Sequence, residues 1–164
     1  MYRLDSKTGP PRLMLADDGT PVKTENAEQL AAAIPRIGLC DGSCGLGSKC
    51  PRKAASPGYT VARLGGLNPR RRRAETLGSE WLVLDVDDET VTEALEPYER
   101  VLIPTHSGHW HVLVRLERMA TPDEYDATIA PWMSQGADPR AKDVCRFLFA
   151  PAPNAFVTVY AGVA

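Results

Sequence analysis

The sequence has few aromatic residues and no long apolar run, and each absence removes a class of protein. Aromatic residues make up 7% of the 164 residues. We find no pair of aromatics on an exposed strand face, which is the arrangement that RNA-binding sheets use to stack bases. No stretch is long enough and apolar enough to cross a bilayer, and the polar segment Met1–Asp5 is unlike an export signal. We therefore expect a cytoplasmic protein with no membrane partner.

The chain also lacks an excess of positive charge. Its formal net charge is -2, with 43% hydrophobic and 24% charged residues, which is an ordinary composition for one globular domain. Any binding of nucleic acid must therefore come from a local basic patch. The four cysteines of a cytoplasmic protein are expected to be free or metal-bound rather than paired in disulfides.

The segment Trp81–Asp88 is an apolar run that ends in three carboxylates. Such a run predicts a buried strand with a charged end. Because side chains alternate along a strand, Asp85 and Asp87 are expected to point the same way. A divalent cation such as Mg²⁺ or Mn²⁺ would relieve their repulsion. The alternative is an acidic strand exit in which Asp88 caps a helix over 89–96.

All three histidines lie between a strand predicted at 101–104 and the end of a second predicted strand. In that second strand, His109 and His111 share one face, whereas Trp110 and Val112 lie on the opposite face, which is expected to be core. A lone histidine on a strand is more often structural. Histidines clustered beside a Ser-Gly turn favour a functional site.

Three cysteines, Cys40, Cys44 and Cys50, lie in a glycine-rich loop that is followed by basic residues. This pattern predicts most of a structural zinc site. Cys145 or a histidine would have to supply the fourth ligand. The alternative is a flexible loop with unpaired thiols.

Four consecutive arginines, Arg70–Arg73, form the strongest local concentration of positive charge. Guanidinium groups match the geometry of phosphate oxygens, so the run predicts a patch that contacts nucleic acid. The alternative is a solvated loop.

The remaining pattern predicts alternating short helices and strands. Thr24 is the expected N-cap of a helix that Pro35 ends, and Thr121 with Glu124 predicts a capping box for a second long helix. The other expected elements are a strand over 58–64, a short helical stretch within 138–146 and a last strand over 156–160.

Three features in order resemble the archaeo-eukaryotic primase superfamily, the primase-polymerases. They are Asp-x-Asp at a strand end, Ser-Gly-His-Trp-His at 107–111, and the acid-bearing segment 138–146. The chain is most similar to the phage and plasmid replication branch, in which a segment like Leu67-Asn68-Pro69-Arg70 precedes the catalytic strand. The resemblance covers about residues 58–155. Where that branch has Arg-x-Pro-Gly before an asparagine, this chain has Phe149–Asn154.

The resemblance implies an α+β fold in one domain, 1–164. Its catalytic core, 58–164, would be built on an RRM-like antiparallel sheet with a smaller N-terminal αβ unit. Residues 1–57, which the resemblance does not cover, are expected to form an N-terminal arm, a helix and the cysteine loop. The implied activity is template-dependent nucleotidyl transfer by a DNA primase, a DNA polymerase or both. The implied partners are a single-stranded DNA template, NTP or dNTP, and a helicase domain or protein.

The resemblance also implies roles for individual residues. Asp85 and Asp87 would hold two Mg²⁺ or Mn²⁺ ions, with Asp138 or Asp143 as the third catalytic carboxylate. The residues implied to bind the incoming nucleotide are Ser107, Gly108, His109, His111 and Arg146.

Two other functions fit parts of the sequence. His109-Trp110-His111 also matches the His-hydrophobe-His pattern of rolling-circle replication nucleases and relaxases, in which both imidazoles bind one metal and a tyrosine attacks the DNA phosphate. Tyr160 and Tyr125 are the candidate nucleophiles downstream. The third function is a non-catalytic nucleic-acid-binding module that uses Arg70–Arg73 and the cysteine loop.

Overall fold

The computed structural model describes residues 1–67, 69–87 and 89–163. Asn68, in the segment implied to precede the catalytic strand, and Asp88, the expected helix cap, lie outside the described residues. Within the described ranges the chain is an α+β protein whose strands form two antiparallel sheets, with strand orders β2-β1-β3-β8 and β4-β5-β7-β6-β9. We call these the smaller and the larger sheet.

The strands and helices alternate along the chain as follows. The strands are β1 (Tyr2–Leu4), β2 (Arg12–Leu13), β3 (Gly58–Thr60), β4 (Arg63–Leu64), β5 (Thr76–Val86), β6 (Arg100–Pro104), β7 (Trp110–Ala120), β8 (Leu148–Phe149) and β9 (Thr158–Tyr160). The α-helices are α1 (Ala27–Ala33), α2 (Pro51–Ala55), α3 (Glu89–Ala94) and α4 (Pro122–Ser134). Short 3₁₀ turns lie at Gly47–Lys49, Arg73–Glu75 and Pro139–Ala141.

Strand β5 is apolar at consecutive positions because both of its faces are buried. Leu82 and Leu84 pack with Tyr125 and Ile129 of α4 on one face. On the other face, Trp81 belongs to a separate core cluster. A strand covered on both sides loses the polar half of the usual alternation. The predicted buried strand is therefore confirmed as an interior strand of the larger sheet, between β4 and β7.

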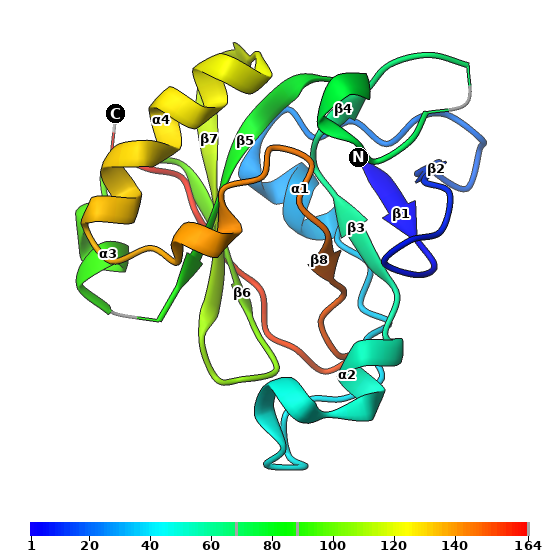
Figure 1. Cartoon of the computed structure of the whole chain (residues 1–164), viewed down its shortest axis with the longest axis vertical. Helices are drawn as coiled ribbons and strands as arrows, with labels where there is room; N and C mark the ends of the chain where they lie inside the picture. The colour runs from blue at the N-terminus through cyan, green and yellow to red at the C-terminus, as the bar shows by residue number, and fades with distance from the viewer. Residues whose placement is uncertain (68, 88, 164) are drawn as a thin grey trace.

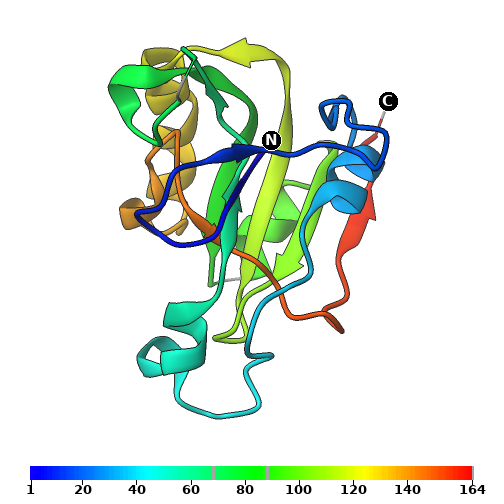
Figure 2. The same cartoon turned by 90° about the vertical axis from the view of Figure 1, so that its right-hand side faces the viewer.

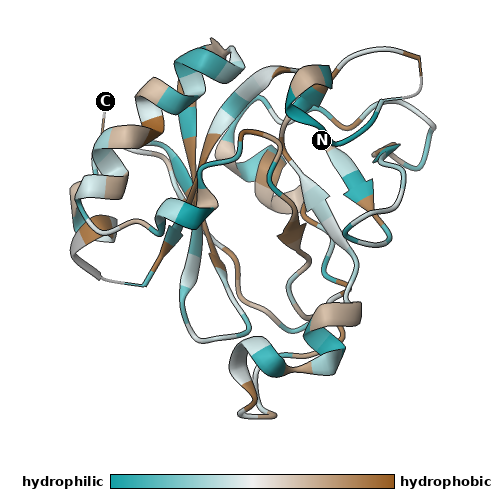
Figure 3. Ribbon diagram, viewed as in Figure 1, coloured by the Kyte–Doolittle hydropathy of each residue, from teal (hydrophilic) through white to brown (hydrophobic). Residues whose placement is uncertain are grey.

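The second face of the larger sheet packs against α1 and the smaller sheet. Leu30 of α1, Tyr59 of β3 and Leu148 of β8 share a core cluster with Val83 and Leu113 of the larger sheet. Figure 1 shows α3 and α4 beside β5 and β7 on one side, and β3 and β8 on the other. Figure 2, turned by 90°, looks onto the larger sheet, so that β5, β7, β6 and β9 lie beside one another. Strand β8 is strongly hydrophobic in Figure 3.

Strand β7 follows the predicted alternation. Val112, with Trp110 packed beside it, lies in the core under α4, as expected. His111 lies directly opposite Asp85 in the antiparallel register of β5 and β7. Side chains of paired residues in neighbouring strands lie on the same face of a sheet. The pairing therefore places both residues on the face that looks toward the smaller sheet.

Of the two helix N-caps predicted from the sequence, one is confirmed and one is wrong. The capping box is confirmed, because Thr121 and Glu124 bond each other's backbone amides at the start of α4. The prediction that Thr24 caps the first helix is wrong. Asn26 caps α1 instead, through a side-chain oxygen that accepts from the Gln29 amide. Asparagine is at least as good a cap as threonine, and it lies closer to the first apolar residue of the helix.

The single strand predicted over 58–64 is also divided. Residues 58–60 form β3 in the smaller sheet, whereas 63–64 form β4 in the larger sheet. Between them the Thr60 hydroxyl accepts a hydrogen bond from the Ala62 amide. This local bond pairs the Ala62 amide at the point where the chain passes from one sheet to the other.

Candidate functional site

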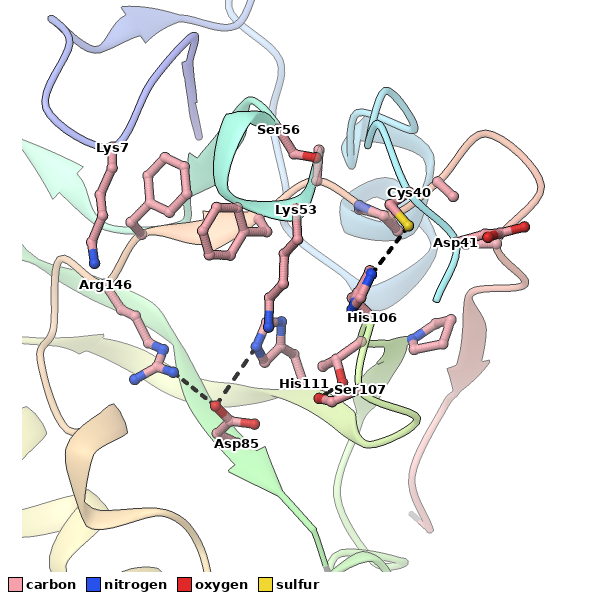
Figure 4. Close-up of a pocket in the computed structure, with 18 of the residues that line it drawn as sticks. Lys7, Cys40, Asp41, Lys53, Ser56, Asp85, His106, Ser107, His111 and Arg146 are labelled. Carbon is pink, nitrogen blue, oxygen red and sulfur yellow. Dashed lines mark hydrogen bonds and ion pairs between the residues drawn. The ribbon is translucent and has the colours of Figure 1, made fainter. Parts of the chain in front are cut away.

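A cavity of about 620 Å³ opens between the two sheets, on the face that carries Asp85 and His111. The helix α2 and the 105–109 turn between β6 and β7 also contribute to its walls. Figure 4 shows Lys53, His111 and Arg146 converging around Asp85. The cavity lies where the apolar core of this face ends, so the charged groups are partly shielded from solvent.

Asp85 is held by groups from two distant segments. The guanidinium of Arg146 donates from Nη2 to Asp85 Oδ2 at 2.7 Å, and His111 Nε2 lies 3.9 Å from the same oxygen. The Asp85 side chain is 19% exposed and that of His111 is 12% exposed. Three residues far apart in sequence therefore meet at the wall of one cavity.

The electrostatic environment of His111 keeps its imidazole neutral. Burial, with the nearby positive charges of Arg146 and Lys53, lowers the pKa of His111 to about 3. A neutral imidazole surrounded by cations has the electrostatics of a site that accepts an anion.

The environment of Asp85 disfavours its charged form, in part because its carboxylate lies near other acids. Burial raises the pKa of Asp85, the Arg146 guanidinium lowers it, and the carboxylates of Asp87 and Asp138 raise it further. Repulsion among three carboxylates is the condition that a bound divalent cation relieves. In the described residues, however, these acids are not gathered around one point as a ready-made ligand set.

Asp138 and Asp143 were both candidates for the third carboxylate, and they occupy different places. The Asp138 amide donates to the Asp85 carbonyl at 3.0 Å. Ala137, next to it, forms a bridge with Val86 at the end of β5. Asp143 also lines the cavity, but its carboxylate accepts from the Cys145 amide and thiol. The Asp138 carboxylate accepts from the Arg140 amide and Nε, and Asp138 does not line the cavity. Asp138 is therefore the acid joined to Asp85 through the backbone, whereas Asp143 is the acid that lines the cavity.

Asp87 and His109 form a second pair just beyond the cavity. His109 Nδ1 lies 2.5 Å from Asp87 Oδ1, and the Asp87 side chain is 60% exposed. Neither residue lines the cavity, whereas His111 does. The two histidines of the predicted site thus have different surroundings, and His111 is the one directed at the cavity.

The predicted Ser-Gly turn lies at the mouth of the cavity. Thr105 and Ser107 line it, and their hydroxyls are hydrogen-bonded to each other at 3.1 Å. The Gly108 amide donates to the Thr105 carbonyl, and its φ of 84° suits a glycine.

The arginine run does not form one continuous patch. Arg73 is paired with Asp123 and Asp126 of α4. Arg71 lines the cavity and donates to the Cys145 and Lys7 carbonyls. Arg70 and Arg72 are exposed. Of the predicted patch, Arg71 is therefore the residue placed closest to a ligand in the cavity.

The cysteine loop meets the 105–109 turn at one edge of the cavity. Cys40, Cys44, Cys50 and His106 each offer a ligand atom, and these atoms lie within 4.8 Å of one another. This group can bind a metal such as zinc. The sequence left the fourth ligand open between Cys145 and a histidine. Cys145 lies elsewhere, beside Asp143, and the structure supplies His106.

Several cavity residues were not predicted from the sequence. Their contribution is positive charge and apolar contact rather than acids. They are Lys7, Lys53, Arg140, Phe147, Phe149 and Asn154. The basic residues after Cys50 were a visible signal for Lys53, and the segment Phe149–Asn154 already stood out as the counterpart of a family motif.

Comparison with protein-family models, with curated proteins and with solved structures found no match to this chain. Among the described residues, none of the helices combines the length and apolarity needed to cross a bilayer.

Proposed function

We propose that this protein is a template-dependent nucleotidyltransferase, a DNA primase or DNA polymerase of the primase-polymerase type, with its active site in the cavity at Asp85. The observation that carries the proposal is the convergence of Asp85, His111 and Arg146 on one cavity. These residues come from the three segments, in the same order, that resemble the superfamily. In this proposal the larger sheet corresponds to the RRM-like catalytic sheet.

The donor set suits Mg²⁺ or Mn²⁺, because the carboxylates of Asp85, Asp87 and Asp138 repel one another and divalent cations prefer oxygen ligands. Asp85, at the wall of the cavity, would hold the metal together with Asp87 and Asp138, which lie outside the cavity lining. Arg146, now paired with Asp85, would exchange that carboxylate for a phosphate oxygen. When bound, two such ions stabilise the attacking and leaving oxygens of an in-line displacement.

The cavity walls provide the groups that a nucleoside triphosphate needs. Lys53 and Arg146 supply positive charge beside the neutral imidazole of His111, which can donate a hydrogen bond to a phosphate oxygen. The Ser107 hydroxyl lies on the adjacent turn. Phe149, half-buried in the opposite wall, offers a surface for a base or sugar. These groups bind and orient the triphosphate, while single-stranded DNA supplies the template.

The direct test is templated incorporation of labelled nucleotides on single-stranded DNA with Mn²⁺, with and without a primer. We expect Asp85→Asn to lower incorporation by about 100-fold or more, since the group stabilises charge that develops in the transition state. Asp17→Asn, at an exposed position in a loop, is the matched control. Circular dichroism checks that both variants are folded. Undiminished incorporation by Asp85→Asn would rule out this active site.

The histidine pair separates this proposal from the rolling-circle nuclease. We expect His111→Gln to weaken triphosphate binding by about tenfold, the amount of one charge-assisted hydrogen bond, and His109→Gln to have a much smaller effect. In a nuclease that binds one metal through both imidazoles, the two substitutions would weaken binding to the same extent. Isothermal titration calorimetry with dATP makes the comparison.

The position of Tyr160 also weighs against the nuclease. Tyr160 lies on β9 opposite Arg100, whereas His111 lies opposite Ile103, so the two are on strands separated by β6 and three register positions apart. The other candidate, Tyr125, is buried under β5, where its hydroxyl accepts from the Val83 amide. A covalent protein–DNA adduct on denaturing gels that disappears in Tyr160→Phe would favour the nuclease.

A further inference from the structure

The group formed by Cys40, Cys44, Cys50 and His106 has spacing that matches a tetrahedral metal centre. His106 Nε2 lies 3.1 Å from Cys40 Sγ and 3.4 Å from Cys44 Sγ. A tetrahedral zinc ion with Zn–S of about 2.3 Å and Zn–N of about 2.0 Å separates its sulfur and nitrogen ligand atoms by about 3.5 Å. Three sulfurs and one imidazole nitrogen are also a donor set that selects zinc.

Hydrogen bonding alone does not account for this cluster. Two sulfur atoms approach the same nitrogen of His106, although a ring nitrogen carries at most one proton or one lone pair. Cys50 Sγ in turn accepts from the Lys53 amide at 3.4 Å. Amide donors to sulfur stabilise a thiolate, which is the form that a metal binds.

The loop backbone is shaped to bring these side chains together. Gly42 has a φ of +94°, and a Cβ at this position would lie 2.7 Å from the His106 carbonyl oxygen. Gly45, beside Cys44, also has a positive φ, +67°. Glycine is the residue that tolerates both the conformation and the close approach. The loop can therefore pack directly on the segment that carries His106.

We propose that Cys40, Cys44, Cys50 and His106 hold a structural zinc ion that joins two walls of the cavity. Cys50 is the N-cap of α2, and the same helix carries Lys53 into the cavity. His106 stands between Thr105 and Ser107, which line the cavity from the opposite wall. One ion thus fixes the position of Lys53 relative to the 105–109 turn, and two of its ligands, Cys40 and His106, also line the cavity.

The zinc site is independent of the proposed nucleotidyl transfer, but its effect on triphosphate binding rests on that function. The first measurement is therefore the zinc content of freshly purified, reduced protein. We expect about one zinc per chain in the native protein. Cys44→Ser and His106→Ala should lose zinc on dialysis against a mild chelator, whereas Cys145→Ser and His109→Ala should retain it. Cys44 is exposed, so its replacement removes a ligand without opening the core.

Two results would overturn the zinc site. One is native, reduced protein that contains no zinc and cannot be loaded with it. The other is equal retention of zinc by the ligand variants and the controls. Co²⁺ substitution provides a spectroscopic check, because tetrahedral thiolate coordination gives strong visible bands that should weaken in Cys44→Ser.

The joining role is tested by hydrogen exchange on zinc-loaded and zinc-stripped native protein. We expect removal of zinc to speed exchange in both 40–56 and 104–109, and to weaken dATP binding by about tenfold, as loss of the Lys53 contact would. Faster exchange confined to the cysteine loop would overturn the proposal that zinc joins the two walls, while leaving the proposal of zinc binding intact. Absence of dATP binding in the zinc-loaded protein would instead count against the proposed function. The exchange result would still show whether zinc joins the two walls of the cavity.

Discussion

The buried imidazole of His111 makes the stability of the fold depend on pH in a defined window. In the folded protein the pKa of His111 is lowered to about 3, first by burial and then by Arg146 and Lys53. In the unfolded chain it returns to an ordinary value of about 6.5. Between these two values the unfolded state binds a proton that the folded state does not. Stability therefore falls as the pH falls below about 6.5.

The size of the effect follows from the same two pKa values. Within this window each pH unit costs about 1.4 kcal/mol for one such group. Lowering the pH from 7.5 to 5 should therefore cost about 2 kcal/mol through His111 alone. The side chain is 12% exposed, so solvent screening reduces this value little. His111→Gln has no proton to bind and should lack this contribution.

The assay is urea denaturation of the native protein and His111→Gln at pH 7.5 and pH 5, without added Mg²⁺ or Mn²⁺. The difference between the two proteins isolates His111 from the acids that titrate in both. Adding dATP should shrink the difference, because a bound polyanion raises the pKa of the imidazole. Equal losses of stability in the two proteins, or an NMR signal of His111 that titrates near 6.5, would refute the argument.

Two further predictions concern stability around α4. Tyr125→Phe should lower the free energy of unfolding by about 1–3 kcal/mol, because the buried hydroxyl accepts from the Val83 amide at 2.9 Å. A change below about 0.5 kcal/mol in urea denaturation would contradict this prediction. Thr121→Ala should lower the free energy of unfolding by about 1 kcal/mol through loss of the capping box, whereas Thr121→Ser should keep most of that stability. Equal melting temperatures for the native protein and both variants would show that the cap contributes nothing.

The strand pattern predicted Asp85 at the end of a buried strand, whereas its grouping with His111 in one site was implied by the family resemblance alone. An apolar run that ends in acids predicted the strand, and pairing of β5 with β7 sets Asp85 opposite His111. The same alternation predicted that Asp87 would accompany Asp85. The structure keeps the two near each other, but Asp87 lies beyond the end of β5, where it pairs with His109. Asp87 is more exposed than Asp85. This difference depends on how far the smaller sheet covers the larger one, which no local sequence pattern encodes.

Contacts across long sequence separations could not be predicted in the same way. His106 lies 66 residues from Cys40 along the chain, so the sequence left the fourth ligand open. The sequence shows Lys53 as part of a basic stretch and no more, because its entry into the cavity depends on the fold of the cysteine loop. The division of 58–64 into strands of two different sheets is set by long-range pairing with β1, β8 and β5, which a local hydrophobic pattern does not contain.

The two proposed sites differ in how the protein positions their side chains. Asp85, His111 and Arg146 are mostly buried at the cavity wall and contact one another directly. Lys53 lies on a five-residue helix, which is too short to be stable by itself in water. A cation on such an element needs another anchor, and a metal bound at its N-cap, Cys50, supplies one. The positive charge of Lys53 would then be as firmly placed as the strands, although it comes from a single short helix.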